Sequence, residues 1–196
     1  MSNDRKICLL FLSILVLGFA PLTEAFCQDE QVREADMSRT QQHFFRELQK
    51  LEGKRFSGKV IYMARPIEAF DGAELVIEVL KVSDTELRIP FRVGDDSSRT
   101  WVIQLNERGL QFKHDHRHED GTPESLTNYG GWGTHYGTTH RQHFPADKET
   151  IDMLPDAATN VWTIEVRPDG AVLIYDLARD SAPRFRAEFD LTKPIK

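Results

Sequence analysis

From Gly53 to the end of the chain, apolar residues recur at every second position, and short turn-rich segments interrupt them at close intervals. The clearest example is residues 86–93, where the apolar positions are Leu87, Ile89, Phe91 and Val93. Side chains alternate between the two faces of a β-strand, so this spacing is typical of strands that bury one face. The chain is therefore constrained to a mainly β fold of short strands and tight turns.

The alternation predicts about nine strands, over residues 55–63, 73–82, 86–93, 100–106, 110–116, 136–144, 160–167, 171–178 and 184–191. We expect an antiparallel meander closed into a single small β-barrel, because closure removes exposed strand edges. A sandwich of two sheets is the alternative. Several strands carry polar residues on both faces, which suits a barrel with a partly polar interior better than a dry sandwich.

One segment before the strands has helical spacing instead. Phe44, Phe45, Leu48 and Leu51 recur as on one face of a helix, and Gly53 follows as a stop signal. This pattern predicts a short amphipathic helix that plugs or flanks one end of the barrel.

Residues 1–25 have the pattern of a signal peptide. Arg5 and Lys6 precede the apolar run 7–20, and Ala25 is a small residue at the expected cleavage point. The run is shorter than the ~20 residues that span a bilayer, so we expect export without stable membrane insertion after cleavage. An uncleaved anchor is the alternative. The expected location is the periplasm or the exterior of a bacterium.

The expected organisation is a signal peptide over 1–25, a flexible polar leader over 26–39 and a single barrel-like domain over 40–196. Cys27 raises the alternative of a lipoprotein, but Phe26 stands where such signals carry a small residue. Cys8 leaves with the signal, so the mature chain keeps one cysteine and forms no internal disulfide. The 25 basic and 31 acidic residues are scattered without a basic run, which argues against a nucleic-acid partner.

The first candidate site is the segment 113–121, which carries His114, His116 and His118 at alternate positions. On a strand, His114 and His116 point the same way, roughly 7 Å apart, and such a pair can ligate zinc or another transition metal. His118, or one of His135, His140 and His143, is expected to complete the metal site. The alternative is a solvated network in which the neighbouring acids only form ion pairs.

The second candidate is a set of arginines on the polar faces of strands: Arg88, Arg92, Arg184 and Arg186. If these side chains face inward, a guanidinium in an apolar cavity can bind a carboxylate or phosphate through paired hydrogen bonds. The buried positive charge then needs an acidic partner, and Glu86 and Glu188 are the candidates. Facing outward, the same side chains are ordinary surface residues.

The third candidate is the aromatic and glycine-rich loop 129–136, which carries Tyr129 and Trp132. Flexible glycines beside large rings predict a lid or stacking surface over a ligand. The alternative is a rim loop that packs its rings against the barrel end. We also expect Trp101, in phase with the inward face of its strand, to contact the ligand.

The expected layout resembles that of the lipocalin and fatty-acid-binding (calycin-like) barrels. It consists of a helix, the segment 51–58 that leads into the first strand, and a meander of strands after it. Gly53-Lys54-Arg55 stands where lipocalins carry Gly-x-Trp. The stretches 99–101, 113–123 and 160–163 are similar to an uncharacterised family of secreted bacterial proteins, which implies export and no particular activity.

Three functions follow as hypotheses. The first is a small-molecule binder whose ligand enters through the rim built by residues 113–136. The second is a metal-dependent, zinc-type hydrolase centred on His114 and His116. The third is an envelope protein that binds a partner and has no pocket. No nucleophile elbow or phosphate-binding loop is present, so whether the chain is an enzyme stays open.

Overall fold

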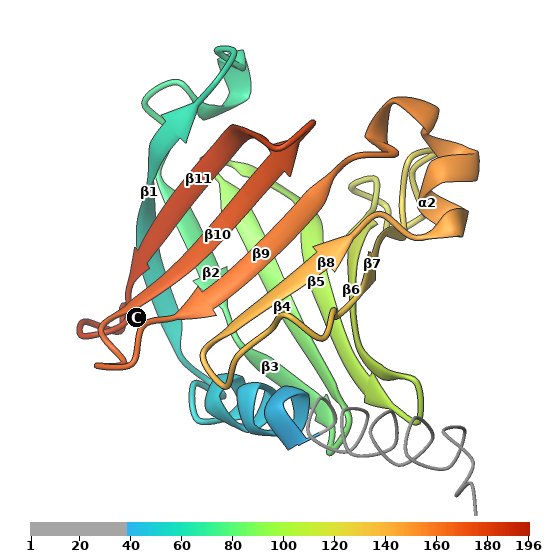
Figure 1. Ribbon diagram of the computed structural model, residues 1–196. Coiled ribbons are helices and arrows are strands. Elements are labelled where there is room, and N and C mark those ends of the chain that lie inside the picture. Colours follow the sequence, from blue (N-terminus) through green and yellow to red (C-terminus); the bar gives the residue numbers. More distant parts are fainter. Residues whose placement is uncertain (1–38) are drawn as a thin grey trace, which may run out of the picture.

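The computed structural model describes residues 39–196 (Figure 1). Ten antiparallel strands form a nearly closed barrel in the order β7-β6-β5-β4-β2-β1-β11-β10-β9-β8, and β3 pairs with β4. The strands are β1 (Arg55–Met63), β2 (Leu75–Glu78), β3 (Leu80–Ser83), β4 (Glu86–Val93), β5 (Asp96–Asn106), β6 (Gly109–His116), β7 (Tyr129–Trp132), β8 (Arg141–Pro145), β9 (Val161–Val166), β10 (Val172–Arg179) and β11 (Ala182–Asp190). The helices after β1 are η1 (Glu68–Phe70), α2 (Lys148–Met153) and η2 (Pro155–Ala157).

The barrel nearly closes where β7 meets the end of β8. Gly131 forms a bridge with Ala146, and a Cβ atom on Gly131 would lie only 1.7 Å from the Pro145 carbonyl oxygen. Glycine is therefore required for the two strands to approach this closely. Thr150 of α2 ties β7 from outside, because its hydroxyl accepts a hydrogen bond from the Gly130 amide at 2.7 Å and donates one to the Gly130 carbonyl at 2.8 Å.

The other end of the barrel is closed by the helix over residues 39–49, here called the plug helix. It lies across the lower opening in Figure 1. Its apolar face is fully withdrawn from solvent, with Phe44, Phe45 and Leu48 at 1% exposure or less. These three side chains belong to the same hydrophobic core as the inward-facing residues of the strands. Burial of three such side chains stabilises the closed end by about 1.5–3 kcal/mol each.

The predicted fold class is confirmed: the chain is mainly β, antiparallel and barrel-shaped, and the plug helix occupies one end. The predicted bounds of β1 and β4 agree with the structure, and β6, β9, β10 and β11 differ by a few residues. The calycin-like layout is consistent with this nearly closed barrel. The prediction of a β-sandwich as the alternative is wrong.

Three local predictions are wrong. The strand predicted over 73–82 is two strands, and the outward residues Leu80 and Val82 are exposed. Alternation from Phe56 through Val60 predicts that Tyr62 also faces the core, but a bulge between Val60 and Tyr62 shifts the register, and Tyr62 is 45% exposed. The segment 129–136, predicted to be a loop, begins with β7, and the strand predicted over 136–144 corresponds to β8, which covers only Arg141–Pro145.

The described residues do not include the expected signal peptide or nearly all of the expected leader. They also do not include Cys27, the residue considered for lipid attachment. Within residues 39–196, no helix is both long enough and apolar enough to cross a membrane.

Candidate functional site at the barrel mouth

The end of the barrel opposite the plug helix contains a cavity of about 210 Å³, here called the mouth cavity. Most of its wall is aromatic or aliphatic, and its polar lining residues are Arg99, His114, His116 and the tyrosines 129 and 175. Phe70 of η1 belongs to this wall, and its ring centroid lies 5.1 Å from that of Phe185. Trp101 and Tyr175 stack 4.6 Å apart at the floor, so the middle of the barrel below them is filled.

His114 is fixed deep in the wall of this cavity. Its Nδ1 lies 3.1 Å from the Tyr129 carbonyl oxygen, which can only accept, so Nδ1 carries the proton. Its Nε2 then accepts a hydrogen bond from the Tyr175 hydroxyl at 2.8 Å. Burial lowers the pKa of His114 to about 3, and the neighbouring His116 adds to the effect. His114 is therefore neutral at ordinary pH, and both of its nitrogens are occupied.

His116 lies nearer the opening and shares Tyr129 with His114. The Tyr129 ring stacks on His114 with centroids 4.6 Å apart, and its hydroxyl lies 3.0 Å from His116 Nε2. Burial raises the pKa of Tyr129 to about 12, so the phenol keeps its proton and can donate it to His116 Nε2 when that atom is unprotonated. The side chains on alternate positions of β6 and the ring from β7 therefore form one hydrogen-bonded wall.

The charges around His116 have both signs. Burial and the Arg99 guanidinium lower the pKa of His116, whereas Glu124, Asp96 and Asp115 act in the opposite direction. Arg99 forms an ion pair with Asp96 and lies over the Phe70 ring at 5.8 Å. His116 Nδ1 is 3.9 Å from the Glu124 carboxylate. The outer part of the cavity thus offers a cation and a titratable imidazole beside an aromatic wall.

The outward face of β6 is held by ion pairs. Lys113 Nζ lies 2.6 Å from Asp147 Oδ2 at the start of α2. Asp115, 4% exposed, accepts hydrogen bonds from Arg88 at 3.3 Å, Arg117 at 3.0 Å and Thr127 at 3.3 Å. Because both outward neighbours of His114 are anchored, the strand presents its two histidines inward in a fixed register.

The predicted metal site is not assembled by the side chains expected to form it. Within residues 39–196, no three histidine, cysteine, aspartate or glutamate side chains are grouped so that they could hold a metal ion. His118 is exposed in the loop after β6. His143 faces outward and bonds Thr163 at 2.8 Å, and a metal on His114 Nε2 would displace the Tyr175 hydroxyl.

The four predicted arginines lie outside the mouth cavity. Arg88 and Arg92 point outward from β4, as the alternation with its buried apolar residues requires. Arg186 forms a two-bond ion pair with Asp176 on the outer face, at 2.8 and 3.0 Å, and Arg184 lines a separate groove at the rim. Glu86 does bond Arg88, but on the solvent side, and Glu188 pairs with Arg167 instead of Arg184 or Arg186.

The aromatic and glycine-rich segment divides between two places. Tyr129 enters the mouth cavity, whereas Trp132 points outward and packs under Arg108, whose guanidinium lies 4.3 Å from the ring. The glycines were expected to make this segment a flexible lid. Gly130 and Gly131 are instead buried in β7, where they allow close contact with the neighbouring backbone.

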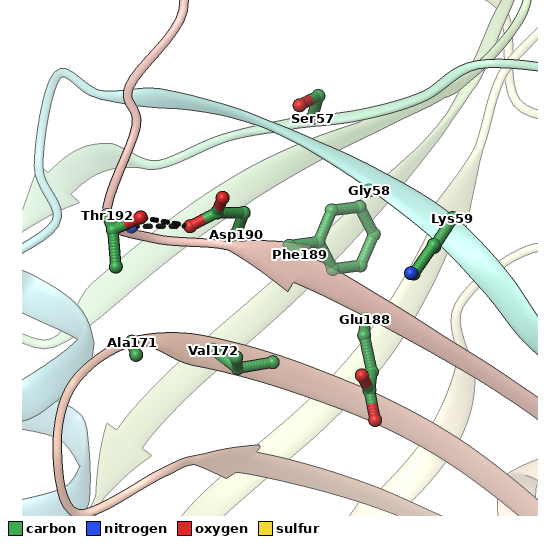
Figure 2. A pocket seen from close by; sticks show the side chains of 9 residues that line it. All are labelled: Ser57, Gly58, Lys59, Ala171, Val172, Glu188, Phe189, Asp190 and Thr192. Carbon is green, nitrogen blue, oxygen red and sulfur yellow. Dashed lines mark hydrogen bonds between the residues drawn. The ribbon is translucent and has the colours of Figure 1, made fainter.

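Figure 2 shows a second hollow, a groove of about 490 Å³ on the outside of β1, β10 and β11. Glycine is required at position 58 in its wall, because a Cβ atom there would lie 2.4 Å from the Phe189 ring. Its acids are not free to meet a ligand: Thr192 bonds Asp190 through its amide and hydroxyl, and Glu188 pairs with Arg167. We therefore place the candidate site at the mouth.

Sequence reasoning missed Arg99 and Tyr175. Arg99 is two positions before Trp101 and shares its inward face, but the strand was predicted to begin only at Thr100, whereas β5 begins at Asp96. Tyr175 is in phase with Leu173 on β10, so alternation placed it inside. Nothing local indicated that it would meet His114, because 61 residues separate the two in the chain.

Comparison of the chain with family models, curated proteins and solved structures found no match. The similarity to an uncharacterised secreted family therefore stays a prediction, and the case for function depends on the geometry of the mouth.

Proposed function

We propose that this protein binds a small molecule with an apolar ring in the mouth cavity. The observation that carries the proposal is the cavity itself: about 210 Å³ of space between an aromatic floor and a rim that bears Arg99, His116 and the Tyr129 hydroxyl. Apolar pockets with a few converging polar groups are the usual form of small-molecule sites.

The size of the cavity limits the ligand. A volume of about 210 Å³ holds roughly seven water molecules and is below the ~300–1,000 Å³ of sites for drug-sized ligands. The ligand therefore has a single ring or an apolar group of similar size. Trp101, Phe91 and Tyr175 supply ring faces for stacking, and ring pairs contribute about 0.5–1.5 kcal/mol beyond the area buried.

The test is calorimetric titration of the protein with the neutral probe 3-phenylpropan-1-ol. We expect one equivalent to bind, and we expect Leu177→Trp to weaken binding at least ~10-fold, because Leu177 lines the cavity and a larger ring fills it. Val82→Trp is the matched control, since Val82 is 57% exposed on β3. Undiminished binding to Leu177→Trp would place the probe elsewhere.

We also propose that the chain is exported in a bacterium to the periplasm or exterior, on the evidence of residues 1–25. Intact-mass measurement of the protein recovered from its host tests this proposal. A mature chain that begins at Phe26 is the expected result, and a full-length chain in the cytosol contradicts it.

A further inference from the structure

A groove of about 500 Å³ beside the mouth cavity is lined by three arginines. Arg65 follows β1, Arg179 ends β10 and Arg184 belongs to β11. In the part of the chain that the structure describes, residues 39–196, no aspartate or glutamate lines this groove, although the full sequence has a net charge of −6. Clustered cations in a hollow raise the local concentration of anions. We call this hollow the arginine groove.

The three guanidinium groups are poorly neutralised by the protein. Arg179 Nε bonds the neutral side chain of Asn160 at 2.7 Å. Arg184 has one ion-pair contact, 3.6 Å to Asp180, whose side chain is 65% exposed, and its buried Nε has no hydrogen-bond partner. Within residues 39–196, Arg65 forms no hydrogen bond or ion pair with another side chain, whereas Arg186 forms two hydrogen bonds with the Asp176 carboxylate.

The arginine groove and the mouth cavity adjoin each other. Ile67, Leu177 and Phe185 line both hollows, so these apolar side chains form a wall that the two hollows share. A molecule whose ring enters the mouth cavity can therefore extend a short linker past Leu177 to the arginines. Guanidinium groups match carboxylate and phosphate oxygens with paired, charge-assisted hydrogen bonds.

We propose that the ligand is an amphipathic organic anion: a single-ring body joined by a short linker to a carboxylate or phosphate held in the arginine groove. This inference rests on the proposed binding of a ring in the mouth cavity. It adds the chemical class of the ligand and assigns Arg65, Arg179 and Arg184 to its head group.

Three probes test the inference by calorimetry on protein produced from the full-length chain. They are 3-phenylpropanoate, 2-phenylethyl phosphate and the neutral 3-phenylpropan-1-ol. We expect at least one anion to bind ~10-fold or more tightly than the alcohol, and the tighter anion assigns the head group as carboxylate or phosphate. The preference should shrink as salt is raised, because the arginines are partly exposed.

The double variant Arg179→Gln with Arg184→Gln should abolish the preference for the anion and leave the affinity for the alcohol unchanged. The matched control is Arg46→Gln with Arg92→Gln, which removes the same charge from exposed positions on the plug helix and β4. Binding of the alcohol also reports that each variant is folded. Should the double variant fail to fold, Arg65→Gln repeats the test at an exposed residue and should weaken anion binding several-fold.

The outcomes separate the two proposals. If the alcohol binds and neither anion binds more tightly, the anionic ligand class is wrong and ring binding stands. If the preference survives loss of Arg179 and Arg184, the head group does not lie in the arginine groove, and the inference is overturned. If none of the three probes binds, the proposed function itself fails.

Discussion

The two ends of the barrel are built by the same strands and have opposite character. Along the inward face of β6, Leu110 and Phe112 at the plug end are followed by His114 and His116 at the mouth. On β5, the order is mirrored: Arg99 and Trp101 lie at the mouth, and Ile103 is fully buried toward the plug. The alternation that buries one face is unchanged, but the chemistry of the buried residues changes along the strand.

The difference indicates that the ends have different roles. At the plug end, apolar burial is complete and stabilises the fold. At the mouth, six aromatic side chains and two histidines surround unfilled space, so atoms there lack contacts that a packed core would provide. Stability is concentrated at one end, and the capacity to bind at the other.

The largest expected effect is at the plug end. Phe44→Ala should lower the free energy of unfolding by about 3–5 kcal/mol, because Phe44 is fully buried in the core. Phe70→Ala at the mouth should cost clearly less, since Phe70 is only half-buried. Urea unfolding of both variants measures the difference. Equal losses of stability would contradict the division between a stabilising plug and a binding mouth.

The second effect is a pH dependence that belongs to the mouth. The pKa of His114 is about 3 in the folded protein and 6.5 when exposed, so below pH 6.5 the unfolded chain binds a proton that the folded chain does not. The stability from neutral His114 is therefore complete above pH 6.5 and is lost as the pH falls toward 3, by about 1.4 kcal/mol per pH unit.

His114→Gln removes this titration while keeping a donor and an acceptor at the same place. The difference in unfolding free energy between wild type and variant should therefore change by on the order of 3 kcal/mol from pH 6.5 to 4.5. Carboxylates with lowered pKa, such as Asp147, titrate equally in both proteins and cancel. A difference that stays constant with pH would show that His114 is not buried and neutral.

A smaller effect is expected where α2 holds the β7 wall of the mouth. Thr150→Val keeps the shape of the side chain but leaves the buried Gly130 amide without its partner, which should cost about 1–3 kcal/mol. Amide hydrogen exchange should accelerate in β7 and remain unchanged in the plug helix. Thr192→Val is the control: it also removes a hydroxyl that donates a hydrogen bond, here to Asp190, but at an exposed position where water can replace it, so the loss should stay below about 1 kcal/mol.

Much of the barrel was predictable, because period-two alternation records which face of a strand is buried. It located β4 and β6 and placed His114, His116 and Trp101 inside. It failed where the backbone departs from the simple pleat. The bulge between Val60 and Tyr62 turns the Tyr62 side chain to the outer face of β1. The strand β7 is too short and too rich in glycine to show alternation.

The site was predictable only within single strands. Alternation puts His114 and His116 on one face, but it cannot say that Tyr175 and Tyr129 occupy the imidazole nitrogens. Those bonds depend on which strands become neighbours across the closed barrel. The arginines were chosen by their charge and their positions on the polar faces of strands, and neither property distinguishes the paired Arg186 from the poorly neutralised Arg184.

The smallest effect is expected for a substitution on the outer face of the barrel, behind the mouth. Arg88→Gln should lower stability by less than about 1 kcal/mol, because its side chain is 40% exposed and Asp115 keeps its bonds to Arg117 and Thr127. Binding of 3-phenylpropan-1-ol should be unchanged, since Arg88 points away from the cavity that the histidines line. Urea unfolding and calorimetry measure the two quantities. A loss of binding would mean that the ion pairs behind β6 set the position of His114 and His116 at the mouth, and that the outer face contributes to the site.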